Sequence, residues 1–150
     1  MNITRQLPRS KKIAMVAHDN RKQELIEWAI INKQLLARHE LVATGTTGRL
    51  LEHELQQPIQ KLMSGPLGGD QQIGSRIAEG KLDVLIFFWD PMEAQPHDPD
   101  IKALLRLAVV WNIPLACDKA TADFIFTSPL MYEDYHAQVS DYSAYTQRKV

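Results

Sequence analysis

The stretch Val84-Leu85-Ile86-Phe87-Phe88-Trp89 decides the fold class of this chain. It is a continuous apolar run, and such runs are typical of strands that are covered on both faces, as in a parallel sheet. Four further apolar runs predict companion strands, and the run at 59–63 is the weakest of them. These runs lie at residues 13–17, 41–43, 59–63 and 113–116.

Segments with helical periodicity separate these strands. Apolar residues recur every three or four positions from about 21 to 39, 70 to 79 and 101 to 112. Gly80 follows the second segment, where a C-cap glycine belongs. The alternation of strand and helix implies right-handed crossovers. We therefore expect residues 1–150 to form a single three-layer α/β/α domain around a doubly wound, mainly parallel five-stranded sheet.

The composition narrows the classes of protein to consider. The 150 residues include 17 Lys and Arg against 18 Asp and Glu. This balance argues against a general nucleic-acid binder, which usually carries a basic excess. Cys117 is the only cysteine, so an intrachain disulfide is impossible and a reducing compartment is expected. Every apolar run is too short for a membrane span or a signal-peptide core. We expect a cytoplasmic protein with no membrane partner.

Polar and glycine-rich clusters follow every predicted strand, whereas the opposite connections look like plain surface turns. In an open α/β sheet, ligands bind beyond the carboxyl ends of the strands. The clusters are residues 18–22, 44–48, 64–70, 90 with 96–100, and 118–121. This asymmetry predicts one ligand site at one edge of the sheet.

The cluster Thr44-Gly45-Thr46-Thr47-Gly48 combines three hydroxyls with two glycines, which suits a phosphate monoester. Glycine lets the backbone approach a ligand, and a following helix N-terminus offers free N–H groups. The alternative is an ordinary turn with a threonine as helix N-cap. This cluster is not a Walker A loop, because no Gly-Lys-Thr/Ser follows it at the required spacing.

Lys22 favours the phosphate interpretation of that cluster. Arg21 and Lys22 lie in the first turn of a predicted helix, where a cation opposes the helix dipole. A bound anion would resolve this conflict, and a broken local rule of this kind is often functional. A solvated lysine is the alternative.

Candidate acid–base groups lie in two of the clusters. Asp70 ends the glycine-rich loop 64–70, where it is either a base facing the ligand or an N-cap for a helix beginning at Gln71. His97 lies in a loop stiffened by three prolines, and histidine exchanges protons near neutral pH. Asp100 either orients that imidazole or caps the helix that follows.

Other chemistries fit the sequence poorly. Nitrogen and oxygen ligands for a metal are present at His18, Asp19, Asp90, His97 and Asp100, but no recognised metal-ligand spacing occurs among them. Ser64 lacks the Gly-x-Ser-x-Gly elbow of a serine hydrolase. We expect neither a metal nor a cofactor.

Taken together, the motifs resemble bacterial methylglyoxal synthase, in order and from about residue 11 to 128. The tail after Pro129 resembles that family less clearly. The motifs that carry the resemblance are 16–19 (VAHD), 43–48 (ATGTTG), 64–72 (SGPLGGDQQ), 87–91 (FFWDP), 96–100 (PHDPD) and 120–123 (ATAD).

The resemblance implies a lyase that forms methylglyoxal and inorganic phosphate from dihydroxyacetone phosphate. It implies that Asp70 takes the C3 proton and that His97 and Asp100 assist proton movement at the substrate oxygens. It also implies a homohexamer that free phosphate inhibits, and His18 and Asp19 beside the site. The implied phosphate cradle consists of Lys22, Thr44, Thr46, Thr47, Ser64 and Gly65.

One residue departs from the family, and two rival functions remain. Asp118 stands where the family usually has asparagine, so a charge there could alter phosphate affinity. The first rival is a non-catalytic phosphate-binding module, like the regulatory domain of carbamoyl phosphate synthetase. The presence of Asp70, His97 and Asp100 together favours the enzyme. The second rival is a sugar-phosphate isomerase or an aldolase-like enzyme, which only the resemblance disfavours.

Overall fold

The computed structural model describes residues 2–93 and 98–147. In this part of the chain, five strands form a parallel sheet in the order β4-β3-β2-β5-β6. This arrangement confirms the predicted fold class, and the strand ends differ from the predicted ones by two residues at most. The strands are β2 (Lys12–Ala17), β3 (Glu40–Thr44), β4 (Ile59–Leu62), β5 (Val84–Phe88) and β6 (Leu115–Ala116).

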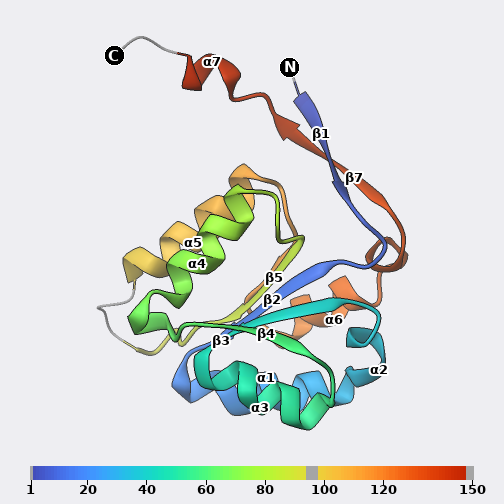
Figure 1. The fold of residues 1–150 in the computed structure, drawn as a ribbon, viewed down its shortest axis with the longest axis vertical. Helices are drawn as coiled ribbons and strands as arrows, with labels where there is room; N and C mark the ends of the chain where they lie inside the picture. The colour runs from blue at the N-terminus through green and yellow to red at the C-terminus, as the bar shows by residue number, and fades with distance from the viewer. Residues whose placement is uncertain (1, 94–97, 148–150) are drawn as a thin grey trace.

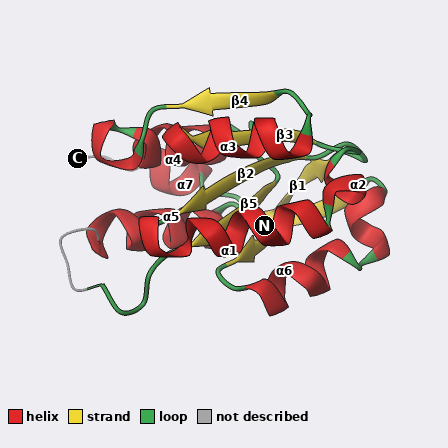
Figure 2. Ribbon diagram, turned by 90° about the horizontal axis from the view of Figure 1, so that it is seen from below, coloured by secondary structure: helices red, strands yellow, loops and turns green. Residues whose placement is uncertain are grey.

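Helices cover both faces of this sheet, as Figures 1 and 2 show. On one face lie α1 (Lys22–Ile31), α2 (Lys33–Leu36), α3 (Gly45–Leu55) and α6 (Lys119–Phe126). On the other lie α4 (Gly69–Ala78) and α5 (Asp98–Val110). Short 3-10 turns connect them at η1 (Asp19–Arg21), η2 (Gly65–Leu67) and η3 (Pro129–Tyr132).

The continuous apolar runs are explained by the two cores on opposite faces of the sheet. Met15 and Ile86 belong to the core under α1, α3 and α6. Their neighbours Val16 and Phe87 belong to the core under α4 and α5. Fully burying such a side chain stabilises the fold by roughly 1.5–3 kcal/mol. A polar residue in these strands would therefore be costly on either face.

The predicted helix boundaries need three corrections. The segment predicted as one helix from 21 to 39 is divided into α1 and α2, with Asn32 between them bonded through Nδ2 to the carbonyl of Trp28 at 2.9 Å. Helix α4 begins at Gly69 and α5 at Asp98, both earlier than predicted. The sequence prediction gives no bounds for α3 or α6.

An antiparallel ribbon of β1 (Asn2–Leu7) and β7 (Tyr135–Ser140) joins the two ends of the chain and was not predicted. It extends away from the sheet, with the short helix α7 (Ser143–Thr146) beyond it (Figure 1). An isolated two-stranded ribbon is marginally stable. This one buries Leu7, Ala137 and Val139 on its inner face, and Arg5 donates a hydrogen bond to the carbonyl of Leu82. Packing against the body of the molecule therefore stabilises it.

Candidate active site

The carboxyl ends of the parallel strands meet at one edge of the sheet, on the left of Figure 1, where α3, α4 and α5 begin. After β2 the chain moves outward through β3 to β4, and then crosses back to place β5 on the other side of β2. This reversal creates a crevice between the ends of β2 and β5, where open α/β sheets bind ligands.

A pocket of about 440 Å³ opens at this edge. Its walls come from the segments that follow β2, β3 and β4, together with Glu93 after β5. Nine residues predicted for the site line it: His18, Asp19, Lys22, Thr44, Thr46, Thr47, Ser64, Gly65 and Asp70. The structure thus brings the predicted phosphate cradle and the predicted base into one pocket.

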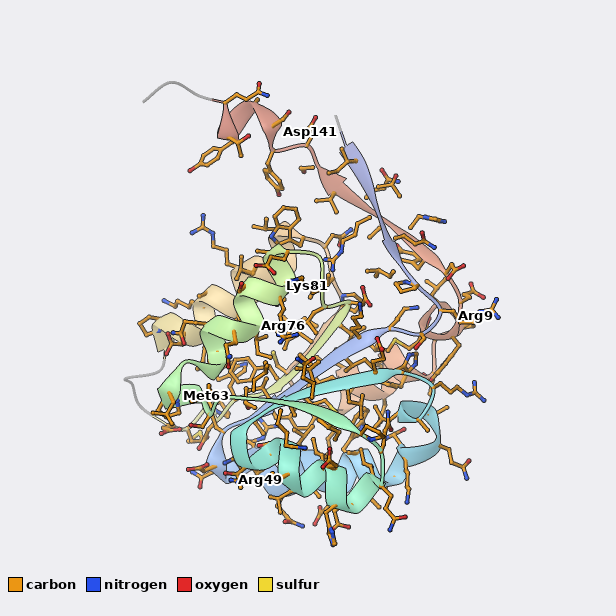
Figure 3. The ribbon with its side chains drawn as sticks, viewed as in Figure 1. Arg9, Arg49, Met63, Arg76, Lys81 and Asp141 are labelled. Carbon is orange, nitrogen blue, oxygen red and sulfur yellow. The ribbon has the colours of Figure 1, made fainter. Side chains whose placement is uncertain are left out.

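A larger hollow, of about 770 Å³, lies at the opposite edge, beside the starts of β2, β3 and β4. In Figure 3, Met63, which precedes the pocket-lining Ser64, lies near the start of α4, whereas Arg76 and Lys81, which line the larger hollow, lie toward the other end of that helix. None of the predicted site residues that the structure describes lines it, so volume alone is a poor guide to the site in this fold.

The threonine-glycine cluster forms the junction between β3 and α3. Gly45 begins the helix with φ of +43°, and a β-carbon there would lie 3.0 Å from the Cα and Cβ of Ser64. Glycine is needed for this approach, which brings the loop after β4 against the start of α3. Thr44 is at the N-cap position, but its side chain makes no capping bond. The alternative, in which the threonine side chain caps the following helix, is therefore not observed at Thr44.

Lys22 is the first residue of α1 and lines the pocket, as the phosphate interpretation requires. Its Nζ lies 2.7 Å from Asp19 Oδ1, and this hydrogen bond lowers the pKa of Asp19. Asp19 therefore balances the cation in the protein itself. The unfavourable position of Lys22 in the helix dipole does not, on its own, point to a ligand.

Asp70 is the second residue of α4 rather than its cap. The cap is Gly68, with φ of +106° and no side chain to bond. Both carboxylate oxygens of Asp70 lie 3.6 Å from the point where a β-carbon on Gly65 would stand. The carboxylate therefore lies beside Gly65, one of the predicted cradle residues. The alternative in which a helix begins at Gln71 with Asp70 as its cap is wrong.

Gly69 fixes the place of Asp70. A β-carbon at this position would lie 2.1 Å from the carbonyl oxygen of Met63, a distance that atoms cannot adopt. The start of α4 can therefore pack directly on the end of β4. This contact between two backbone segments sets where α4 begins, and so where the Asp70 side chain leaves the helix at the pocket wall.

Of the two remaining predicted catalytic residues, Asp100 is not among the residues that line the pocket. Asp100 is in the first turn of α5, and its Oδ1 accepts a hydrogen bond of 3.2 Å from Gln71 Nε2. It lines a smaller hollow between α4 and α5, which also reaches Asp70. His97 lies outside the described residues. The roles of His97 and Asp100 stay predictions.

Asp118 lies outside the pocket lining as well. Its Oδ1 accepts a bond of 2.7 Å from the backbone N–H of Thr121, which caps α6 and lowers the pKa of the carboxyl. The departure from the family at this position therefore has a structural use. An asparagine could accept the same bond.

Six lining residues were not among the predicted site residues: Val16, Ala17, Asn20, Gly45, Pro66 and Glu93. Asn20 belongs to the cluster after β2, so its position carried a signal, but an asparagine in such a cluster suggests no particular chemistry. Among the described residues, no group of three or more His, Cys, Asp and Glu side chains is arranged to hold a metal ion.

The fold and the pocket define an α/β protein of the MGS-like domain class, whose family model matches residues 24–117. The methylglyoxal synthase of Saccharophagus degradans is 59% identical over 139 residues, which are 93% of this chain and 90% of that one. The enzyme of the same name from Coxiella burnetii is 58% identical over 138 residues, covering 92% and 96%. The crystal structure of methylglyoxal synthase from Elizabethkingia anophelis superposes with a TM-score of 0.93, with 55% identity over 99% and 97% of the two chains. This chain belongs to the methylglyoxal synthase family.

Proposed function

We propose that this chain is a carbon–oxygen lyase that converts dihydroxyacetone phosphate into methylglyoxal and inorganic phosphate. One observation carries the proposal beyond family membership. The Asp70 carboxylate and the threonine-glycine cradle line the same pocket, and both carboxylate oxygens lie 3.6 Å from the point where a β-carbon on Gly65 would stand. An acid–base group beside an anion site is what an elimination of phosphate needs.

The reaction begins with the transfer of a C3 proton to Asp70. The electrons of the C–H bond form an enediolate between C3 and C2. That enediolate then expels phosphate from C1, and the resulting enol takes up a proton as it rearranges to methylglyoxal. The C1–O bond must stand roughly perpendicular to the enediolate plane for this expulsion. A rigid cradle that fixes the phosphate enforces that angle.

The chain's residues supply binding and charge balance for these steps. The backbone N–H groups at the start of α3 suit the phosphate oxygens, as helix N-termini generally do. Lys22 adds a cation at the same pocket, and the hydroxyls of Thr44, Thr46 and Thr47 add donors. His97 and Asp100 are proposed to assist proton movement at the substrate oxygens. Preorganised donors of this kind often supply a large part of catalysis.

Several properties of the whole protein remain proposals beside the reaction. We expect one domain over residues 1–150, a homohexamer, inhibition by inorganic phosphate and a cytoplasmic location. In the described parts of the chain, no helix is long and apolar enough to cross a membrane.

The test is to incubate the purified protein with dihydroxyacetone phosphate and to measure three products. Methylglyoxal and inorganic phosphate in equal amounts support the lyase. Glyceraldehyde 3-phosphate without phosphate release would support an isomerase. Inorganic phosphate binding without turnover would support a regulatory binding module, and either of these results would refute the proposal.

A further inference from the structure

A set of hydrogen bonds crosses the crevice between the ends of β2 and β5. Asn20 Nδ2 donates to Asp90 Oδ2 at 2.9 Å, and the backbone N–H of Met92 donates to Asp90 Oδ1 at 2.9 Å. The backbone N–H of Asp90 donates to His18 Nδ1 at 3.0 Å. The Asn20–Asp90 pair, with the Met92 N–H, is called the latch below.

The latch orients His18, which lines the pocket. Because Nδ1 accepts from a backbone N–H, the neutral ring carries its proton on Nε2, and this nitrogen is a donor. The Glu93 carboxylate lies 3.8 Å from Nδ1, which is too far for a hydrogen bond. The tautomer of His18 is therefore set by the position of the Asp90 backbone.

Asp90 itself is turned toward the protein and is not a pocket-lining residue. It is 8% exposed, and each of its carboxylate oxygens accepts a bond from the latch. The titratable and charged groups facing it are His18 and Arg21 from the β2–α1 side, and Glu93 follows in its own loop. The hydrogen bond from Asn20 is the main cause of a lowered pKa of Asp90, and the bond from Met92 lowers this pKa further. Both bonds favour the ionised carboxylate.

We propose that Asn20 is a positioning residue for the lyase reaction, because it holds Asp90 across the β2–β5 crevice and so fixes His18 as an Nε2–H donor at the pocket. This inference rests on the proposed function and adds a residue to it. Asn20 is exposed, so its side chain contributes little to the core. Its amide suits the task because it donates to Asp90 without adding a second negative charge.

The test compares four variants with the wild type. Asn20→Asp places two carboxylates against each other, whereas Asp90→Asn keeps the bond from Met92 only if the Asn20 amide turns so that its oxygen accepts from the new amide. The double variant Asn20→Asp/Asp90→Asn restores both bonds, because the amide introduced at 90 donates to the new carboxylate and accepts from Met92. Asn32→Asp is the matched control, since Asn32 also donates through Nδ2, but to the carbonyl of Trp28, away from the pocket.

We expect Asn20→Asp to lower kcat about 10- to 100-fold at pH 8, in line with the cost of small displacements of catalytic groups. Because Asn20 also lines the pocket, the new carboxylate should weaken inorganic phosphate binding as well, so kcat is measured at saturating substrate and the double variant, with its unchanged net charge, is the matched comparison. As the pH falls toward 6, the facing carboxylates share a proton and the ratio of mutant to wild-type kcat should rise. The double variant should recover most of the activity, and Asn32→Asp should match the wild type.

Two results would overturn the inference. The first is wild-type kcat in Asn20→Asp across the pH range. The second is a double variant as impaired as the worse single variant, because a latch predicts rescue. The ¹⁵N resonances of the His18 ring provide a readout independent of turnover, since loss of the latch should shift the Nδ1 signal. If the wild type forms no methylglyoxal, the proposed function fails, while this spectrum still decides whether the latch sets the tautomer.

Discussion

Replacing Gly65 with alanine should abolish most activity without harming the fold. The new methyl carbon would lie 3.6 Å from both carboxylate oxygens of Asp70, which is ordinary van der Waals contact. Gly65 is not among the residues with positive φ, so alanine fits its backbone. A reacting carbon must itself lie about 3–3.5 Å from the base. The methyl group would therefore occupy the place that the substrate carbon needs.

The magnitude follows from this overlap. Displacing the substrate by about 1 Å costs roughly 100-fold in rate, or about 2.7 kcal/mol of transition-state stabilisation. The melting temperature should hold or rise, because alanine at a compatible position stabilises by about 0.4–1 kcal/mol through the unfolded state. The assay is kcat/KM for dihydroxyacetone phosphate, paired with a thermal melt.

Gly80 offers the converse control. Its φ is +75°, and a β-carbon there would meet nothing within 4 Å. Gly80→Ala should cost about 1–2 kcal/mol through its left-handed backbone, or several degrees in melting temperature, and leave kcat/KM unchanged. Wild-type kcat/KM in Gly65→Ala would show that the reacting carbon does not bind between Gly65 and Asp70, and the assignment of Asp70 as the base would then be lost.

Three further predictions concern single side chains. Asp70→Asn should lower kcat by about 10²–10⁴-fold while inorganic phosphate still binds, and unchanged turnover would remove Asp70 from the mechanism. Asp118→Asn should keep both the α6 cap and the phosphate affinity, and a tenfold change in phosphate inhibition constant would show that its charge reaches the pocket. Burial lowers the pKa of His39 to about 4 from 6.5, so the folded state prefers the neutral ring. This preference contributes about 3 kcal/mol to the free energy of unfolding. The contribution is present above pH 6.5 and is lost as the pH falls toward 4. Urea unfolding at pH 7 and 4.5 should therefore show a smaller loss of stability for His39→Gln than for the wild type.

The sheet was predictable because its strands are buried on both faces. Continuous apolar runs such as Val84 to Phe88 have few alternative explanations, and the alternating cores on either side of β2 and β5 confirm the reason. The ribbon of β1 and β7 was missed because Asn2 pairs with Ser140, at the other end of the chain. Its local alternation is weak, and the packing that stabilises it involves residues far away in sequence.

The pocket residues were predictable to the extent that topology alone places them. Polar clusters at strand ends must share one edge of a parallel sheet, so nine predicted residues line one pocket without any knowledge of side-chain orientation. The latch was beyond prediction, because it depends on which way the Asn20 amide and the Asp90 carboxylate turn. The start of α4 was misplaced for a related reason, since Asp70 is a good capping residue by type and only the contact of Gly69 with Met63 excludes that role.

The distance between the cradle and the base is set by two glycine contacts rather than by side chains. Gly45 brings the start of α3 against Ser64, and Gly69 brings the start of α4 against Met63. The segment 63–65 is thus held between two helix N-termini, one at the proposed phosphate cradle and the other carrying Asp70. Because both glycines lie directly against the backbone of this segment, a larger residue at either position would force the helix and the segment apart. The separation of anion site and carboxylate, on which an elimination depends, is therefore a property of the fold at this edge of the sheet.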